Sequence, residues 1–187
     1  PLPIAVPNFT GNDPIAQQIA EVVRADLEST GLFSITGESA FIQKDLNINV
    51  QPRFPDWKII KTDALVVGDT VRLPDGRIQV AFRLWDVYGG EVMRIDGKAG
   101  RQFTTPASNW RRVAHKIADS IYSRLTGEDG YFDTRIVYIS ETGPVTDRKK
   151  RLAIMDADGA NHKFLTPGIN TILTPRFSTS DQEITYM

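Results

Sequence analysis

The chain has 187 residues, 41% of them hydrophobic and 24% charged, with a formal net charge of −1 and no cysteine. This composition is typical of a globular protein with one large domain or two small ones. It excludes disulfides and thiolate chemistry, provides no basic patch for nucleic acid, and contains no apolar run long enough for a transmembrane segment.

The first 35 residues predict a strand, an amphipathic helix and a second short strand. Ile4-Ala-Val6 is apolar, and Asp13-Pro14 begins the helix, because Asp is a good N-cap and Pro suits the first helical position. Gly31 ends this helix, and residues 32–35 can form the second strand. The apolar face of the helix repeats at helical spacing and consists of Ile15, Ile19, Val22, Val23 and Leu27.

Residues 37–61 are predicted to be an irregular excursion of undefined role. Pro52 and Pro55 interrupt any regular pattern there, and a loop of this length is uncommon in a compact domain. We expect Phe54 and Trp57 to pin the segment to the core.

The next segment predicts a buried strand, a hairpin and one more strand. Ala64-Leu-Val-Val-Gly68 is continuously apolar, as in a strand buried on both faces. Residues 71–73 and 77–87 form a hairpin around Pro74-Asp75-Gly76, and residues 91–95 form a further strand. In the second hairpin strand, apolar residues alternate with more polar ones and give one core face: Ile78, Val80, Phe82 and Leu84.

A second helix is predicted to begin at Thr105-Pro106 and to end at Gly127. Two helices on one sheet of about five strands make an α/β layer domain over residues 1–130. Beyond a boundary near Gly130, short strands with Asp-Gly turns indicate all-β structure over residues 131–187. The apolar stripe of the helix consists of Trp110, Val113, Ala114, Ile117, Ala118, Ile121 and Leu125.

The all-β segment has the pattern of a β-propeller blade followed by the opening strand of the next. The blade strands are Arg135-Ile-Val-Tyr-Ile-Ser140 and Arg151-Leu-Ala-Ile-Met-Asp156, and the next strand follows Pro175. One blade cannot close a ring. We therefore expect this chain to be a fragment of a longer protein.

Four features are candidates for chemistry or binding, and each has a simpler interpretation. His115 lies beside an apolar stripe and lacks a partner at metal-ligand spacing, which favours a structural role; the other histidine is His162. Asp156-Ala-Asp158-Gly159 resembles the start of a calcium loop but lacks the later Glu, which favours a hairpin turn. The basic run 147–151 could hold a phosphate but is typical of a solvated face. The remaining candidates are aromatic anchors for a partner, Trp57, Trp85 and Trp110. Trp110 lies on an apolar stripe, and such a residue is more often part of the core.

No sequence motif supports catalysis. The chain lacks a Gly-x-Gly-x-x-Gly loop, a Walker sequence and a Gly-x-Ser-x-Gly elbow. We therefore assign no catalytic, cofactor-binding or metal-binding residue, and the partner-binding residues stay unknown.

Several stretches in the same order resemble the TolB family, the periplasmic propeller proteins of the Tol–Pal system, over nearly the whole chain. In the first part they are Pro3-Ile-Ala-Val-Pro-Asn-Phe9, residues 23–33, Asp63-Ala-Leu-Val-Val-Gly68 and residues 114–127. In the blade they are Leu152-Ala-Ile-Met-Asp-Ala-Asp-Gly-Ala-Asn161 and Pro175-Arg-Phe-Ser178. One departure is Phe177-Ser-Thr-Ser-Asp181, where the family repeat has Trp-Ser-Pro-Asp-Gly, and we expect a looser turn there.

The resemblance implies an anticodon-binding-like α/β domain followed by a six-bladed propeller, of which this chain holds the first blade and part of the second. It implies a periplasmic protein whose signal peptide has been removed. Such a protein acts by docking partner proteins and is not an enzyme. The implied partners are the Pal lipoprotein, held mainly by the propeller, TolA, held by a segment upstream of Pro1, and colicins. The implied role is outer-membrane invagination at cell division and envelope integrity.

Two alternatives stay open at this point. Similar propellers precede hydrolase domains in serine peptidases, where they regulate access to the active site, and a nucleophile elbow would then lie beyond Met187. Nucleic-acid binding by the first domain is a weaker alternative, because the chain is nearly neutral.

Overall fold

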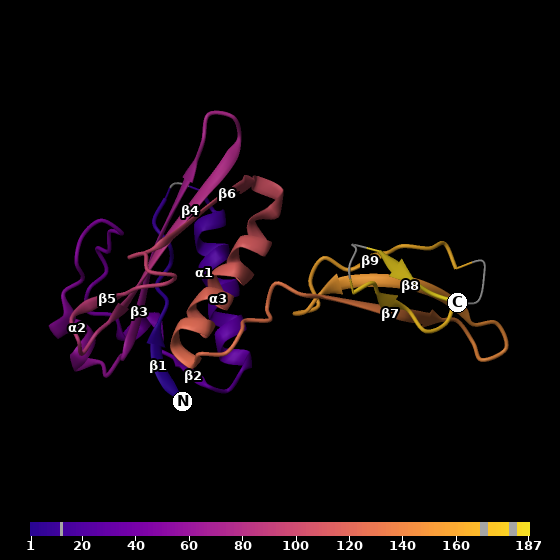
Figure 1. Ribbon diagram of the computed structural model, residues 1–187, viewed down its shortest axis with the longest axis horizontal. Coiled ribbons are helices and arrows are strands. Elements are labelled where there is room, and N and C mark those ends of the chain that lie inside the picture. Colours follow the sequence, from indigo (N-terminus) through magenta and orange to yellow (C-terminus); the bar gives the residue numbers. More distant parts are fainter. Residues whose placement is uncertain (12, 169–171, 180–182) are drawn as a thin grey trace. The chain divides into compact units, whose positions relative to one another are not determined.

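The chain folds into two compact units, Pro1–Phe132 and Asp133–Met187, in a computed structural model that describes residues 1–11, 13–168, 172–179 and 183–187. The first unit is a six-stranded sheet with helices, and the second is built from small antiparallel sheets (Figure 1). The predicted succession of an α/β unit and an all-β unit is confirmed. No helix in the described residues is long and apolar enough to cross a bilayer.

The sheet of the first unit is mixed. Its order is β2-β1-β3-β4, and both β5 and β6 pair with β4. β1 is parallel to its two neighbours, whereas the pairs that β4 makes are antiparallel. The strands are β1 (Leu2–Ala5), β2 (Phe33–Ile35), β3 (Ala64–Arg72), β4 (Arg77–Asp86), β5 (Glu91–Met93) and β6 (Arg101–Pro106).

One face of this sheet is covered by the two long helices, α1 (Ile15–Ser29) and α3 (Trp110–Thr126). The alternation expected for the second hairpin strand is confirmed, because every second residue of β4 is fully buried in this core. Gly127 ends α3 as predicted, in the left-handed conformation with φ 81°. The β4 residues of this core are Ile78, Val80, Phe82 and Leu84.

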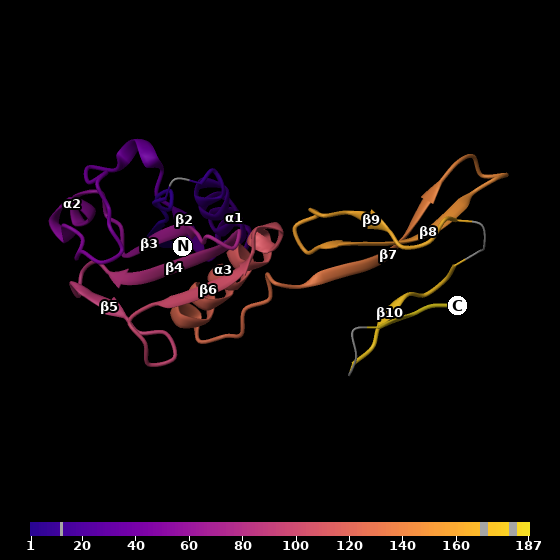
Figure 2. The ribbon, with the colours of Figure 1, turned by 90° about the horizontal axis from the view of Figure 1, so that it is seen from above.

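The other face carries a second, smaller core formed by α2 (Phe54–Ile59) and residues of β3 and β4. α2 lies apart from α1 and α3 (Figures 1 and 2). The expected anchoring is confirmed, since Phe54 and Trp57 are both buried. The expectation of an irregular excursion is wrong in part, because residues 37–61 contain α2 and the 3-10 turn η1 (Glu38–Ala40). Pro55 sits in the first turn of α2, where its missing N–H costs no hydrogen bond.

Three sequence-based boundaries need correction. Thr105-Pro106 does not begin a helix; it ends β6, which pairs along β4 and brings the sheet to six strands. The helix begins only at Trp110, after the 3-10 turn η2 (Ala107–Asn109). The two predicted segments 64–68 and 71–73 are the single strand β3, which pairs with β4 along its whole length.

The start of α1 depends on Asp13. Its carboxylate accepts a hydrogen bond from the Ile15 amide at 3.0 Å and pairs with the Arg72 guanidinium at 2.6 Å. The helix therefore begins at Ile15, one residue later than predicted, with Pro14 as the capping residue. The Ile15 hydrogen bond and, to a lesser degree, Arg72 lower the pKa of the Asp13 carboxyl below its ordinary value.

Replacement of this carboxylate should weaken the first unit. Asp13→Ala is expected to lower the free energy of unfolding by about 1 kcal/mol at neutral pH, a loss similar to that of a side chain that accepts an amide hydrogen bond at a helix start. Because the folded-state pKa is depressed, the contribution is present above the unfolded pKa and is lost as pH falls through the folded value. Urea unfolding at neutral pH and at pH about 2 measures this difference. Asp13→Asn keeps an acceptor and removes the ion pair; equal stability of wild type and Asp13→Ala at neutral pH would contradict the prediction.

The second unit has a three-stranded antiparallel sheet of β7 (Arg135–Thr142), β8 (Lys149–Asp156) and β9 (Lys163–Phe164). A two-stranded sheet follows, β10 (Arg176–Phe177) with β11 (Ile184–Thr185). The predicted turn variant at residues 177–181 lies partly outside the described residues.

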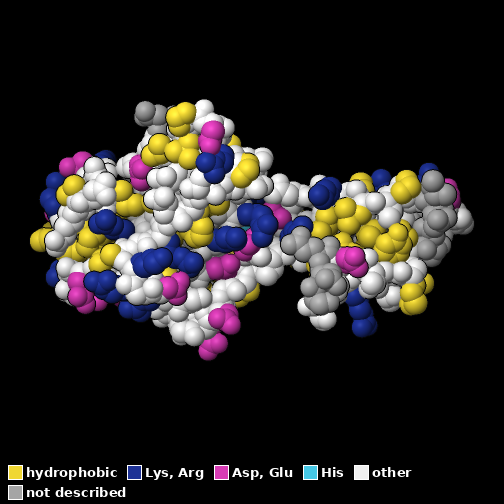
Figure 3. Space-filling view, turned by 45° about the horizontal axis from the view of Figure 1, so that its top comes forward, with side chains coloured by type: hydrophobic (Ala, Val, Ile, Leu, Met, Phe, Trp, Pro, Cys, Tyr) yellow, Lys and Arg dark blue, Asp and Glu magenta, His cyan; other side chains and the backbone are white. Residues whose placement is uncertain are grey.

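The three-stranded sheet is apolar on both faces. The register places Ile136, Tyr138 and Phe164 on one face and Ile139, Leu152 and Ile154 on the other. Ile136 and Phe164 are exposed, and Figure 3 shows apolar side chains gathered over this unit. A sheet that faced water on one side would alternate apolar and polar residues. This sheet therefore has the pattern of one that is covered on both faces.

Candidate interaction surfaces

A histidine–aspartate pair joins the two long helices. His115 Nδ1 of α3 lies 2.6 Å from Asp26 Oδ2 of α1, and both side chains are buried. The burial fits the structural role expected for His115. Sequence reasoning missed Asp26, although a carboxylate between Val23 and Leu27 on an apolar stripe is a usable signal of a buried polar contact.

The tryptophans do not provide exposed anchors. Trp57 is fully buried and Trp85 is 7% exposed, and both belong to the core around α2. Trp110 is half-buried against the core of the two long helices. The suggestion that Trp57 and Trp85 present themselves to a partner is wrong, because the excursion of residues 37–61 folds over that face of the sheet.

The basic run 147–151 is engaged on its own sheet. Arg148 and Lys150 both pair with Glu141, at 2.8 and 2.9 Å, and the Lys150 and then the Arg148 hydrogen bonds lower the pKa of the Glu141 carboxyl. The Arg151 guanidinium lies 3.8 Å from the centre of the Phe164 ring. Most of these cations therefore have local contacts, as on a solvated strand surface.

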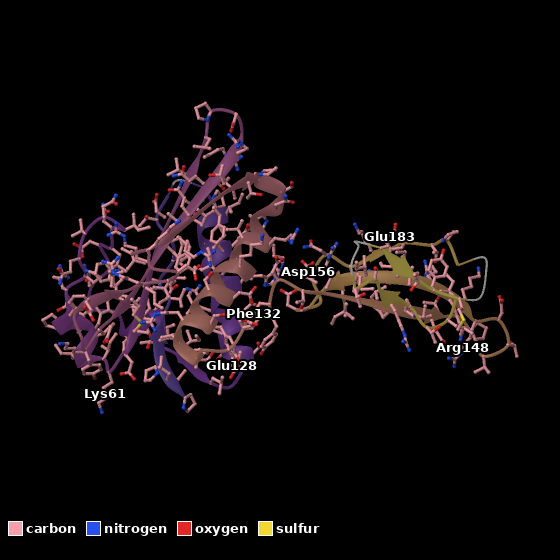
Figure 4. The ribbon with its side chains drawn as sticks, in the orientation of Figure 1. Lys61, Glu128, Phe132, Arg148, Asp156 and Glu183 are labelled. Carbon is pink, nitrogen blue, oxygen red and sulfur yellow. The ribbon has the colours of Figure 1, made fainter. Side chains whose placement is uncertain are left out.

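The Asp156-Ala-Asp158-Gly159 segment forms the turn between β8 and β9. Asp156 Oδ2 accepts a hydrogen bond from Asn161 Nδ2, and Asp158 Oδ1 accepts one from the Ala160 amide. Gly159 has φ 86°, which favours glycine. Asp156 is the last residue of β8, and Arg148 directly precedes the first residue of that strand (Figure 4). These bonds within the turn support the hairpin interpretation over a calcium loop.

An open hollow of about 600 Å³ lies over β4 and the start of β6, and we call it the β4–β6 hollow. Its floor includes Ala81 of β4 and Gln102 of β6, which are paired in register. Ala81 alternates along β4 with Val80 and Phe82, which pack under α1 and α3. The floor is therefore the sheet face opposite these helices. Its wall includes Asn49 of the excursion and Lys98 of the loop before β6. Sequence patterns did not indicate this hollow, because its residues come together only through strand register.

A second hollow lies between α3 and the β5–β6 loop, and two arginines in its lining make local contacts. Arg101 contacts Asp96 at 3.4 Å and donates to Ser120 Oγ at 3.0 Å. Arg124 donates to the Arg94 carbonyl oxygen at 2.9 Å. These contacts fasten α3 to the sheet, and they give this second hollow a structural explanation.

The fold defines a class of protein in which a small α/β domain is joined to strands of a β-propeller. The TolB amino-terminal domain model matches residues 1–93, and the TolB β-propeller domain model matches residues 122–187. A crystal structure of TolB from Acinetobacter baumannii is 26% identical and superposes with a TM-score of 0.81. This match covers 100% of the present chain and 44% of the TolB chain. The chain belongs to the TolB family, and the fold class expected from the sequence is confirmed.

A fainter structural likeness involves the LpoB C-terminal domain from Salmonella enterica. It is 10% identical with a TM-score of 0.41, and it covers 56% of this chain and 82% of that one. A likeness of this size carries no functional argument.

Proposed function

We propose that this protein is a non-enzymatic, periplasmic component of the Tol–Pal system that docks the Pal lipoprotein and TolA. The proposal rests on one observation, the match of TolB models to both units of the chain. In this proposal residues 1–130 are the TolB N-terminal domain and residues 131–187 are the first blade and the start of the second. The role that follows is support of outer-membrane invagination during cell division and of envelope integrity.

The physical character of the second unit supports docking. Propeller blades pack face to face and present short loops on a rigid ring, which makes a platform for a partner. The sheet of β7, β8 and β9 is apolar on both faces, as such packing requires. In this proposal Pal and colicins bind mainly at propeller surfaces beyond these residues, and TolA binds a segment upstream of Pro1 that orders on binding.

The peptidase alternative is less well supported. The TolB amino-terminal domain model matches the unit that precedes the blade, over residues 1–93. A chain that carried the regulatory propeller of a serine peptidase would not be expected to have this α/β unit ahead of the blade. Nucleic-acid binding likewise has no support in the net charge of −1.

Calorimetric titration of the complete mature protein with Pal from the same organism tests the proposal. We expect saturable one-to-one binding. The present chain of 187 residues, titrated in parallel, should bind Pal far more weakly, because it spans only 44% of the length of the TolB chain that it matches. Absence of binding by the complete protein in several buffers would contradict the docking role.

A further inference from the structure

Small residues in its lining, Ala81 of β4 and Ala99 and Gly100 ahead of β6, keep part of the β4–β6 hollow open. Ala81 is paired with Asp69 of β3 on one side and with Gln102 of β6 on the other. Beside Arg83 the chain has Gly100, where an added Cβ would lie 2.7 Å from the Phe82 carbonyl oxygen and 3.0 Å from Arg83 Cγ. The backbone at Gly100 therefore approaches β4 closely, and a side chain there would displace the arginine stem.

Two cations at one end of the hollow lack an acidic partner. Within the described part of the chain, neither Arg83 nor Lys98 makes an ion pair or a side-chain hydrogen bond. Other arginines around this sheet are paired, as Arg77 is with Asp75 at 2.7 Å and Arg101 is with Asp96. The two free cations line the same open space, so they can both reach one anionic group that enters it.

The rest of the lining is suited to a peptide backbone. Gln79, Gln102 and Asn49 contribute amide groups, each of which can both donate and accept. The carboxylate in the lining, Asp69, already accepts the Thr10 hydroxyl at 2.7 Å. In the strand register, Asp69 is paired with Ala81 and not with Arg83. Arg83 lies two residues further along β4. The hollow therefore has a cationic end and a separate region of hydrogen-bonding groups.

We propose that the β4–β6 hollow is a docking site for an acidic peptide segment of a partner protein. A Glu or Asp carboxylate of the segment pairs with Arg83 and Lys98, and the neighbouring peptide groups bond to the amides of Gln79 and Gln102. The charge of the site favours an acidic segment, because a carboxylate neutralises Arg83 and Lys98, which have no acidic partner in the described part of the chain. An open, shallow hollow also favours an extended segment over an enclosed small molecule.

The site is tested with the 187-residue chain and a defined probe, the acetylated and amidated hexapeptide Glu-Gly-Glu-Gly-Glu-Gly. In a titration followed by ¹⁵N NMR, we expect saturable shifts confined to residues 79–83 and 98–102. Arg83→Gln and Lys98→Gln should each weaken binding about fivefold, in the range for partly exposed charge pairs. Ala81→Ile fills the floor without a change of charge and should abolish the shifts.

Matched controls separate this site from general electrostatic attraction. Lys116→Gln removes an exposed cation on α3, which packs on the opposite face of the sheet, and should leave the affinity unchanged. The hexapeptide with Gln in place of Glu should not bind. Equal loss of affinity in Lys116→Gln, or binding of the Gln peptide, would overturn the proposal. Saturation by acetate or inorganic phosphate at the same concentration would also overturn it, in favour of a free-anion site. Since Pal and TolA are not used, failure leaves the Tol–Pal proposal intact.

Discussion

Trp57→Ala is expected to lower the free energy of unfolding of the first unit by about 4 kcal/mol, in the range for a large buried aromatic side chain. Trp57 is fully buried in the core around α2. Its ring contacts that of Phe41 at 5.1 Å, and its Nε1 donates to Gln43 Oε1 at 3.1 Å. The truncation leaves a cavity between the excursion and the sheet, and it removes the contact that holds Phe41.

Urea unfolding followed by circular dichroism measures this loss. The control is Trp110→Ala, which truncates the same residue type at a half-buried position and should cost less than half as much. Hydrogen exchange of residues 41–60 should accelerate more than that of α1, since the excursion depends on Trp57 directly. A loss of less than about 1 kcal/mol in Trp57→Ala would mean that the excursion does not depend on this anchor.

Asp26→Ala is expected to lower the free energy of unfolding by about 3 kcal/mol, because it removes one partner of a buried polar pair and leaves the other in the core. His115 of α3 is 2% exposed and keeps its ring nitrogen in the core after the Asp26 carboxylate is gone. The expected decrease in the free energy of unfolding is therefore larger than the contribution of an ordinary hydrogen bond. Glu28→Ala changes an exposed carboxylate on the same helix and should alter stability by less than about 0.5 kcal/mol.

A double-mutant cycle isolates the pair. Asp26→Leu combined with His115→Leu should be less destabilised than the sum of the two single changes, because no polar group is then left alone. Additive losses would mean that the two side chains do not stabilise each other across α1 and α3. Thermal unfolding of the four proteins supplies the comparison.

The elements predicted best are those whose own residues show the apolar spacing or the turn residues typical of that element. Ile78, Val80, Phe82 and Leu84 alternate over a long stretch, so β4 and its core face follow from the sequence. Pro74-Asp75-Gly76 marks the hairpin, and Gly127 marks the end of α3. In each case the local chemistry and the tertiary fold favour the same conformation.

The elements that were missed depend on partners elsewhere in the chain. β6 has Phe103 as its main apolar residue, and it is a strand because β4 offers it hydrogen bonds. Thr105-Pro106 has the local chemistry of a helix start, so local propensity pointed to the wrong element. The Asp26–His115 pair and the β4–β6 hollow join residues distant in sequence, and no spacing rule brings such residues together.

The place of β1 in the sheet has a mechanical consequence. β1 begins at Leu2, and it lies between β2 and β3, parallel to both. A pull applied at Pro1 is therefore directed along β1 and across its hydrogen bonds, such as that from the Asp63 amide to the Pro3 carbonyl oxygen at 2.9 Å. These bonds are loaded together in shear and do not open one at a time, so tension applied at this terminus is resisted by the pairing of β1 with both β2 and β3.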